Sequence, residues 1–242
     1  MKIGSDFDKI AVDIWGMHLL EPNTALGDVV ILIVSLVFYF KLNKKGDFYN
    51  LWAKFYLCFG FSFFLGGLGH LFFHYFGLFG KSFSWLLGII SPYFIEQTML
   101  SLWHNKRRRK QWMRLSMCKT VALFLLEIVL LISMDPQRDP ALGLIIPTLS
   151  SIIGLGFCLV LLAWKYQNAL HSGFRYFWIG SLVLIPNAGI QALKINFHPW
   201  FDRNDLSHVL LLLGVIIYYN GLIKVRPFME QYENEPVKDL NS

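Results

Sequence analysis

Residues 24–42 read TALGDVVILIVSLVFYFKL, and this stretch decides the class of fold. Apart from Asp28 and Lys41 it carries no charged residue, and as a helix it is long enough to cross the hydrocarbon core of a bilayer. An amphipathic helix of a soluble protein would instead alternate apolar and polar positions every three or four residues. The stretch is therefore typical of a transmembrane helix.

The same pattern recurs along the whole chain. Of its 242 residues, 55% are hydrophobic and only 16% are charged, whereas soluble domains usually carry about a quarter charged residues. The sequence thus predicts an all-α, polytopic membrane protein built as a bundle of seven transmembrane helices. The seven apolar runs lie near residues 24–42, 51–76, 82–103, 113–134, 141–164, 174–193 and 206–224.

The chain divides into three segments around these runs. Residues 1–23 form an N-terminal segment, in which 5–19 are expected to make a short interfacial helix. Residues 24–226 form the seven-helix transmembrane domain, and 227–242 are expected to be a disordered cytoplasmic tail. The composition predicts a multi-pass integral membrane protein, of a bacterial inner membrane or of a eukaryotic endomembrane or plasma membrane.

The basic residues predict the orientation of the bundle. The segments that share a side with the C-terminus carry 14 Lys and Arg residues, against 6 for the N-terminal segment and the loops on its side. Because basic loops stay in the cytoplasm, we expect the N-terminus outside and the C-terminus inside. The block KRRRK at 106–110 is interpreted as a topology signal and a contact for anionic lipid headgroups. Nucleic acid is not an expected partner.

Three histidines stand out within the apolar runs. The stretch GGLGHLFFHYF (66–76) places His70 and His74 four residues apart, on one face of a continuous helix. The stretch NDLSHVLLLLG (204–214) opens the seventh run and places His208 at a similar depth. If the second and seventh helices are neighbours, the three imidazoles converge.

Two interpretations of this cluster remain open at the level of spacing. Three histidines with an open fourth position form a catalytic zinc site, in which bound water becomes a nucleophile. His70, His74 and His208 would then be the ligands and zinc the cofactor. Alternatively, the histidines are interfacial residues that hydrogen-bond to headgroups, to loop carbonyls or to one another. A haem held by His208 and one of the other two is a third, weaker interpretation.

The span order, GLGHLFFH (67–74) and NDLSHVLLLLG (204–214) resemble the alkaline ceramidase and progestin/adipoQ receptor superfamily of intramembrane zinc hydrolases. Its pattern is Ser-x-x-x-His in the second span, an aspartate near the start of the third, and His-x-x-x-His in the seventh. His70 then takes the serine position and His74 the histidine position, while Asn204 and His208 take the seventh-span pair. The resemblance implies a zinc-dependent hydrolase acting on a lipid amide or ester.

This sequence departs from that pattern at two points. The stretch KSFSWLLGII (81–90) contains no carboxylate where the aspartate is expected, and Asn204 is a poor zinc ligand. Either the site is rebuilt around the three histidines, or it has lost the metal. In the rebuilt site, Asp205 or Asp202 would carry the proton, and Asn204 or Ser207 would hold the substrate or the bound water.

A second polar set lies deeper in the predicted spans. Glu96, Asn187 and Gln191 would line a pocket for a polar lipid head or a translocated solute. The alternative is a structural hydrogen-bond network between helices.

Two hypotheses for the function follow. The leading one is a membrane-embedded zinc hydrolase with a membrane acyl-lipid as substrate. The other is a non-catalytic receptor, transporter or scaffold of the same fold, whose histidines serve proton binding, pH sensing or structure. The sequence leaves open whether the protein is an enzyme.

Overall fold

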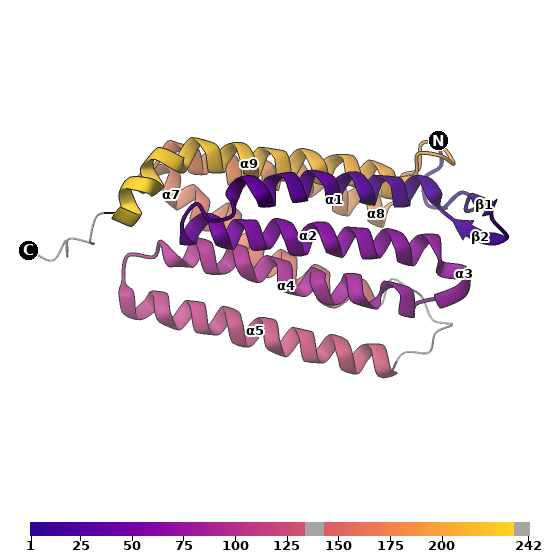
Figure 1. The fold of residues 1–242 in the computed structure, drawn as a ribbon, viewed down its shortest axis with the longest axis horizontal. Helices are drawn as coiled ribbons and strands as arrows, with labels where there is room; N and C mark the ends of the chain where they lie inside the picture. Colours follow the sequence, from indigo (N-terminus) through magenta and orange to yellow (C-terminus); the bar gives the residue numbers. More distant parts are fainter. Residues whose placement is uncertain (134–142, 235–242) are drawn as a thin grey trace, which may run out of the picture.

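The computed structural model describes residues 1–133 and 143–234. Its long helices lie along one common axis, as Figure 1 shows. They are α1 (Pro22–Leu42), α2 (Asp47–Leu71), α4 (Phe79–Ser101), α5 (Lys106–Ser133), α8 (Arg175–Ala192) and α9 (Arg203–Asn234). One further stretch joins α6 (Ile145–Leu155), the π-helix η2 (Gly156–Leu162) and α7 (Ala163–Ala169). The short elements are α3 (Phe73–Phe76) and the 3₁₀-helix η3 (Ser172–Phe174).

Five helical stretches among the described residues are long and apolar enough to cross a membrane. They are Pro22–Leu42, Asp47–Leu71, Lys106–Ser133, Ile145–Ala169 and Arg203–Glu233. The predicted third and sixth runs also lie in helices, α4 and α8, but these two are not among the five. These helices agree with an all-α membrane protein, whereas seven crossings and the orientation stay predictions.

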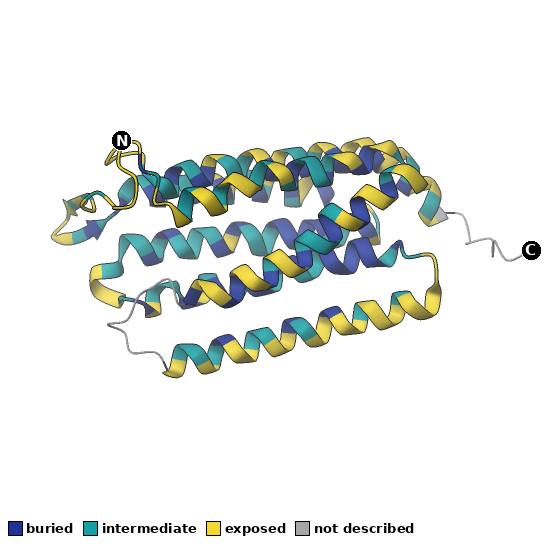
Figure 2. Ribbon diagram, turned by 180° about the vertical axis from the view of Figure 1, so that it is seen from behind, coloured by how far each residue is buried: buried dark blue, intermediate teal, exposed yellow. Residues whose placement is uncertain are grey.

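The distribution of exposed residues fits a lipid-facing surface. Figure 2 shows long exposed faces on the outer helices. In the second half of α5 many exposed side chains are apolar, among them Val121, Leu125, Val129 and Ile132. Apolar surface of this extent is unfavourable in water and favourable in contact with the acyl chains of a bilayer.

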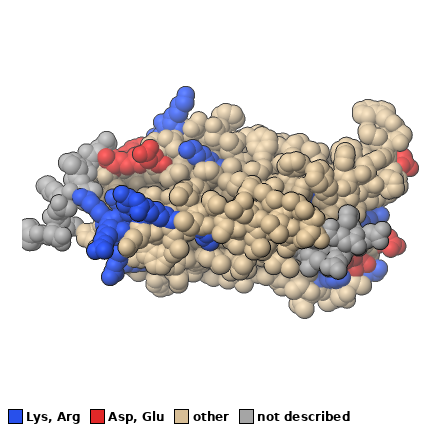
Figure 3. Space-filling view, turned by 90° about the horizontal axis from the view of Figure 1, so that it is seen from below, with Lys and Arg blue, Asp and Glu red and all other residues tan. Residues whose placement is uncertain are grey.

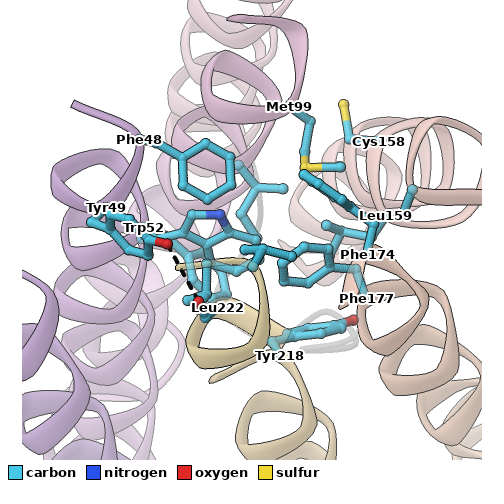
Figure 4. Packing of buried hydrophobic residues seen from close by; sticks show 14 of the residues in the cluster. Phe48, Tyr49, Trp52, Met99, Cys158, Leu159, Phe174, Phe177, Tyr218 and Leu222 are labelled. Atoms are coloured by element: carbon cyan, nitrogen blue, oxygen red, sulfur yellow. Dashed lines mark hydrogen bonds between the residues drawn. The ribbon is translucent and has the colours of Figure 1, made fainter. Parts of the chain in front are cut away.

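The hydrophobic core lies toward the end of the bundle where α1 turns into α2. Trp52 of α2 is fully buried, and its ring stacks on Phe177 of α8 with centroids 5.1 Å apart. The Tyr49 hydroxyl donates to the Leu222 carbonyl of α9 at 3.4 Å, the contact dashed in Figure 4. The aromatic side chains thus join α2, α8 and α9, and the Tyr49 hydroxyl has a backbone partner there.

The N-terminal segment corrects one prediction. Residues expected to form an interfacial helix instead form an antiparallel hairpin of β1 (Ala11–Ile14) and β2 (Met17–Leu20). The two turn residues, Trp15 and Gly16, both have positive φ, 52° and 77°. Such a two-residue turn matches the twist of the flanking strands, and this favours the hairpin over the helix.

The C-terminal helix corrects a second boundary. We expected the tail to begin at residue 227, but α9 continues through Pro227 to Asn234. Tertiary contacts hold this extension: Met229 is buried, and Glu233 accepts a hydrogen bond from the Phe48 amide at 3.1 Å. The remaining part of the predicted tail, 235–242, lies outside the described residues.

Candidate functional site

His70 and His74 do not belong to one helix. α2 ends at Leu71, Phe72 closes it with φ −98° and ψ 19°, and His74 lies on the separate turn of α3. His70 is partly buried, whereas His74 is exposed. The prediction that one helical face carries both imidazoles is therefore wrong, because it assumed a continuous helix across residues 66–76.

His70 belongs to an ionic network at the end of the bundle that carries the hairpin. Its Nδ1 lies 2.7 Å from Oε2 of Glu21, and Nζ of Lys81 lies 3.3 Å from its Nε2. Lys9 reaches the same Glu21 oxygen at 2.6 Å. These partners favour an imidazole that donates from Nδ1 to the carboxylate and accepts at Nε2 from the lysine.

Glu21 lies just before α1 and has a left-handed backbone with φ 50°, which is uncommon for a residue other than glycine. Burial alone would raise the pKa of its carboxyl. The hydrogen bond from His70 and the charges of His70 and Lys9 outweigh that effect and lower the pKa to about 2. The carboxylate is therefore ionised and fixed by its partners.

His74 makes different contacts. Its ring meets that of His18 edge to face, with centroids 5.5 Å apart. His18 in turn lies 2.9 Å from Asp13 through Nδ1, and its amide donates to the Tyr75 hydroxyl at 2.8 Å. His74 thus helps to dock the hairpin on α3.

His208 faces Asp28 across the packing of α9 against α1. Nε2 of His208 and Oδ1 of Asp28 are 3.2 Å apart, and both side chains are buried. Two glycines bring the helices this close. A Cβ on Gly27 would meet His208 Nδ1 at 2.6 Å, and one on Gly67 of α2 would meet Asp28 at 2.8 Å. Glycine backbones of two helices thus pack against a buried pair.

Two buried polar atoms near this pair lack a hydrogen-bond partner among the described residues. They are Nδ1 of His208 and Oγ1 of Thr24, which lies one helical turn before Asp28. Polar atoms without a partner are rare in buried positions. Two of them therefore single out the surroundings of the Asp28–His208 contact as a candidate site.

The first turn of α9 holds the predicted catalytic carboxylates. Asp202 caps the helix by accepting from the Asn204 amide at 2.7 Å. Burial raises the pKa of Asp202, against the effect of these amide hydrogen bonds. Asp205 accepts from Asn23 of α1 at 2.8 Å and from the Asp202 amide at 2.9 Å. Both aspartates therefore already organise the helix start.

Asn204 and Ser207 face α8 rather than Asp28. Nε2 of Gln191 donates to Oγ of Ser207 at 2.7 Å and lies 3.4 Å from Oδ1 of Asn204. The Ser207 hydroxyl donates to the Arg203 carbonyl at 2.7 Å. These contacts hold the end of α8 against the start of α9.

The three residues of the second polar set lie on two helices. Glu96 of α4 forms an ion pair with Lys119 of α5. Asn187 and Gln191 lie one turn apart on α8, where Gln191 contacts α9 and Oδ1 of Asn187 has no partner among the described residues. The contacts of Glu96 and Gln191 thus run to different helices, and a common pocket stays a prediction.

The three predicted zinc ligands have separate partners. His70 contacts Glu21, His74 contacts His18, and His208 contacts Asp28. Within residues 1–133 and 143–234, no group of three His, Cys, Asp or Glu side chains is arranged to hold a metal ion. The arrangement does not fit the zinc site, and we assign none of these residues as a metal ligand.

Comparison with known protein families gives a match over most of the chain. A family described as a family of unknown function, DUF6962, matches residues 23–227, which is more than four-fifths of the chain. The chain belongs to the DUF6962 family. No curated protein matches it. The matched range begins beside Glu21 and includes both Asp28 and His208.

Sequence reasoning missed the partners of the histidines. Asp28 was visible as the one carboxylate in the first apolar run, and an ionisable residue in a membrane span is a functional candidate on that ground alone. Glu127 of α5 carried the same signal, and both of its carboxylate oxygens are buried without a partner among the described residues. Glu21 and Lys81 gave no such signal, because they lie at the ends of apolar runs.

Proposed function

We propose that the protein is a non-catalytic, proton-responsive membrane protein, in which the Asp28–His208 pair binds and releases the proton. The observation that carries this proposal is the 3.2 Å contact of a buried carboxylate with a buried imidazole between α1 and α9. A carboxylate and an imidazole in hydrogen-bond contact are both groups that bind and release a proton near neutral pH when their environment shifts them.

The pair responds to a proton through its hydrogen bond. With one shared proton, the imidazole and the carboxylate attract each other strongly in a medium of low dielectric constant. A second proton leaves a carboxylic acid beside an imidazolium, and the attraction between opposite charges is lost. Because Gly27 and Gly67 pack directly on the two side chains, a change in their separation must shift α1 against α2 and α9.

Charged neighbours adjust this equilibrium. Asp205 of α9 and Lys81 of α4 act electrostatically on Asp28. Lys81 and His70 also belong to the network of Glu21 and Lys9, so the hairpin end is coupled to the pair. The zinc hydrolase rests on the family resemblance and stays a prediction, which metal content tests.

The experiment is hydrogen exchange of the full chain in lipid nanodiscs from about pH 4 to about pH 8, where imidazoles titrate. We expect a pH-dependent step in the exchange of α1 and α9 amides after correction for intrinsic exchange. The step should vanish in Asp28→Asn and in His208→Gln, and it should persist in the exposed control His104→Gln. A step of the same size in all four proteins would contradict the proposal.

A further inference from the structure

A groove lies at the start of α5, at the opposite end of the bundle from the Asp28–His208 pair. Its lining residues are Trp103, Arg108, Gln111, Trp112 and Leu115. The two tryptophan rings stand 6.3 Å apart between centroids, inclined at 36°. Trp112 also rests against Phe157 of η2, at 5.7 Å. The packed rings of Trp103 and Trp112 form the aromatic wall of the groove.

The groove is amphipathic along the helix axis. Arg108, Gln111, Trp112 and Leu115 have the spacing of one helical face, so charge, amide, aromatic ring and aliphatic chain follow one another. Further along α5, exposed Leu125 and Val129 continue as apolar surface. This order matches a molecule with a charged head and a hydrocarbon tail.

A second cation lies beside one of the tryptophans of the groove. Nζ of Lys165, on α7, lies 5.2 Å from the centre of the Trp103 ring. Arg109 donates to the Ser101 carbonyl at 3.2 Å, and Asn105 accepts from the Arg108 amide at 2.9 Å. These contacts fix the backbone turn that carries Arg108, so one cation belongs to the groove lining and a second lies next to its Trp103 ring.

Charge on this face is concentrated at the same end. Figure 3 shows the largest group of Lys and Arg at one end of the face to which α5 contributes, a smaller mixed group of both charges at the other end, and an uncharged middle. Aromatic and basic side chains at the end of an apolar surface are typical of the membrane interface.

We infer that the groove binds the headgroup of an anionic phospholipid from the surrounding leaflet. Arg108 and Lys165 would contact the phosphate, Gln111 the glycerol region, and Trp112 and Leu115 the upper part of an acyl chain. A nucleic acid or an acidic peptide would match the charge, but the apolar continuation along α5 favours a lipid.

The test is native mass spectrometry of the full chain in detergent with equimolar phosphatidylglycerol and phosphatidylcholine. We expect the wild type to retain phosphatidylglycerol preferentially. Arg108→Gln should reduce its occupancy about fivefold, the effect of one basic residue at an anionic surface. The matched control is Arg107→Gln, which removes the same charge from the neighbouring position outside the groove.

Two results would overturn the inference. Equal losses in Arg108→Gln and Arg107→Gln would mean that the basic block acts as a diffuse charge rather than as a site. Equal retention of the two lipids by the wild type would mean that no anionic lipid is selected. A second pair checks the aromatic wall: Trp112→Ala should lower occupancy, and Trp164→Ala, at an exposed tryptophan outside the groove, should not.

Discussion

Asp28 of α1 and His208 of α9 meet at 3.2 Å, although 180 residues of chain separate them. Both are buried, and glycines of α1 and α2 pack directly on them. The contact therefore helps to set the distances between three helices. Removing it should lower the free energy of unfolding of the whole bundle.

His208→Ala is expected to lower the free energy of unfolding by about 3 kcal/mol, because it leaves the Asp28 carboxylate buried without its partner. The double variant with Asp28→Ala should lose less than the sum of the single variants, by about 1 kcal/mol or more. Unfolding by SDS in mixed micelles measures these differences. As a control, the exposed Arg226–Glu230 pair should show a much smaller coupling. Additive effects at Asp28 and His208 would mean that the pair does not interact.

Glu21 predicts a stability change in acid. Burial opposes its ionisation, but the contacts with His70 and Lys9 lower its pKa from the ordinary 4.5 to about 2. A lowered carboxyl pKa stabilises the fold above about pH 4.5, and the contribution is lost as the pH falls toward 2. Its full size is about 3 kcal/mol.

Thermal unfolding between pH 2 and pH 6 measures this contribution. Glu21→Gln should lose stability at pH 6 and approach the wild type at pH 2, whereas Asp8→Asn, at an exposed carboxylate, should follow the wild type throughout. Parallel curves for wild type and Glu21→Gln over the whole range would show that the ionised carboxylate contributes nothing.

Metal content separates the two functional hypotheses. Because the three predicted ligands have separate partners, protein purified with zinc supplied is expected to carry far less than one zinc per chain. His74→Ala and His208→Ala should leave that value unchanged. Elemental analysis of the detergent-purified protein measures the number of zinc ions per chain. About one zinc per chain, lost in both variants, would restore the three-histidine site and justify assays with ceramides and other acyl-lipids.

The sequence predicted the helices better than the contacts between them. Long apolar runs such as 24–42 identify spans, since a bilayer requires them. The failure at His70 and His74 came from local geometry: an interval of four residues implies one face only if no turn intervenes, and Phe72 ends the helix between them. The hairpin was missed although Trp15-Gly16 lies in its turn, because the flanking residues also suit an interfacial helix. The Asp28–His208 contact needed knowledge of which helices are neighbours.

The last prediction concerns Gly67, which gives α1 its close approach to α2. A Cβ at this position would lie 2.8 Å from both Cβ and Oδ2 of Asp28, so Asp28 would have to shift and its contact with His208 would be disturbed. Gly67→Ala should therefore lower the free energy of unfolding by about 1–3 kcal/mol despite the better helix propensity of alanine.

Gly189 of α8 is the matched control, because a Cβ there meets nothing within 4 Å. Gly189→Ala should be neutral or stabilise by up to about 1 kcal/mol. SDS unfolding compares the two variants, and hydrogen exchange of Gly67→Ala should show a smaller pH step than the wild type. If Gly67→Ala were as stable as Gly189→Ala with the pH step intact, the helices would tolerate a wider gap and the pair would not control their packing.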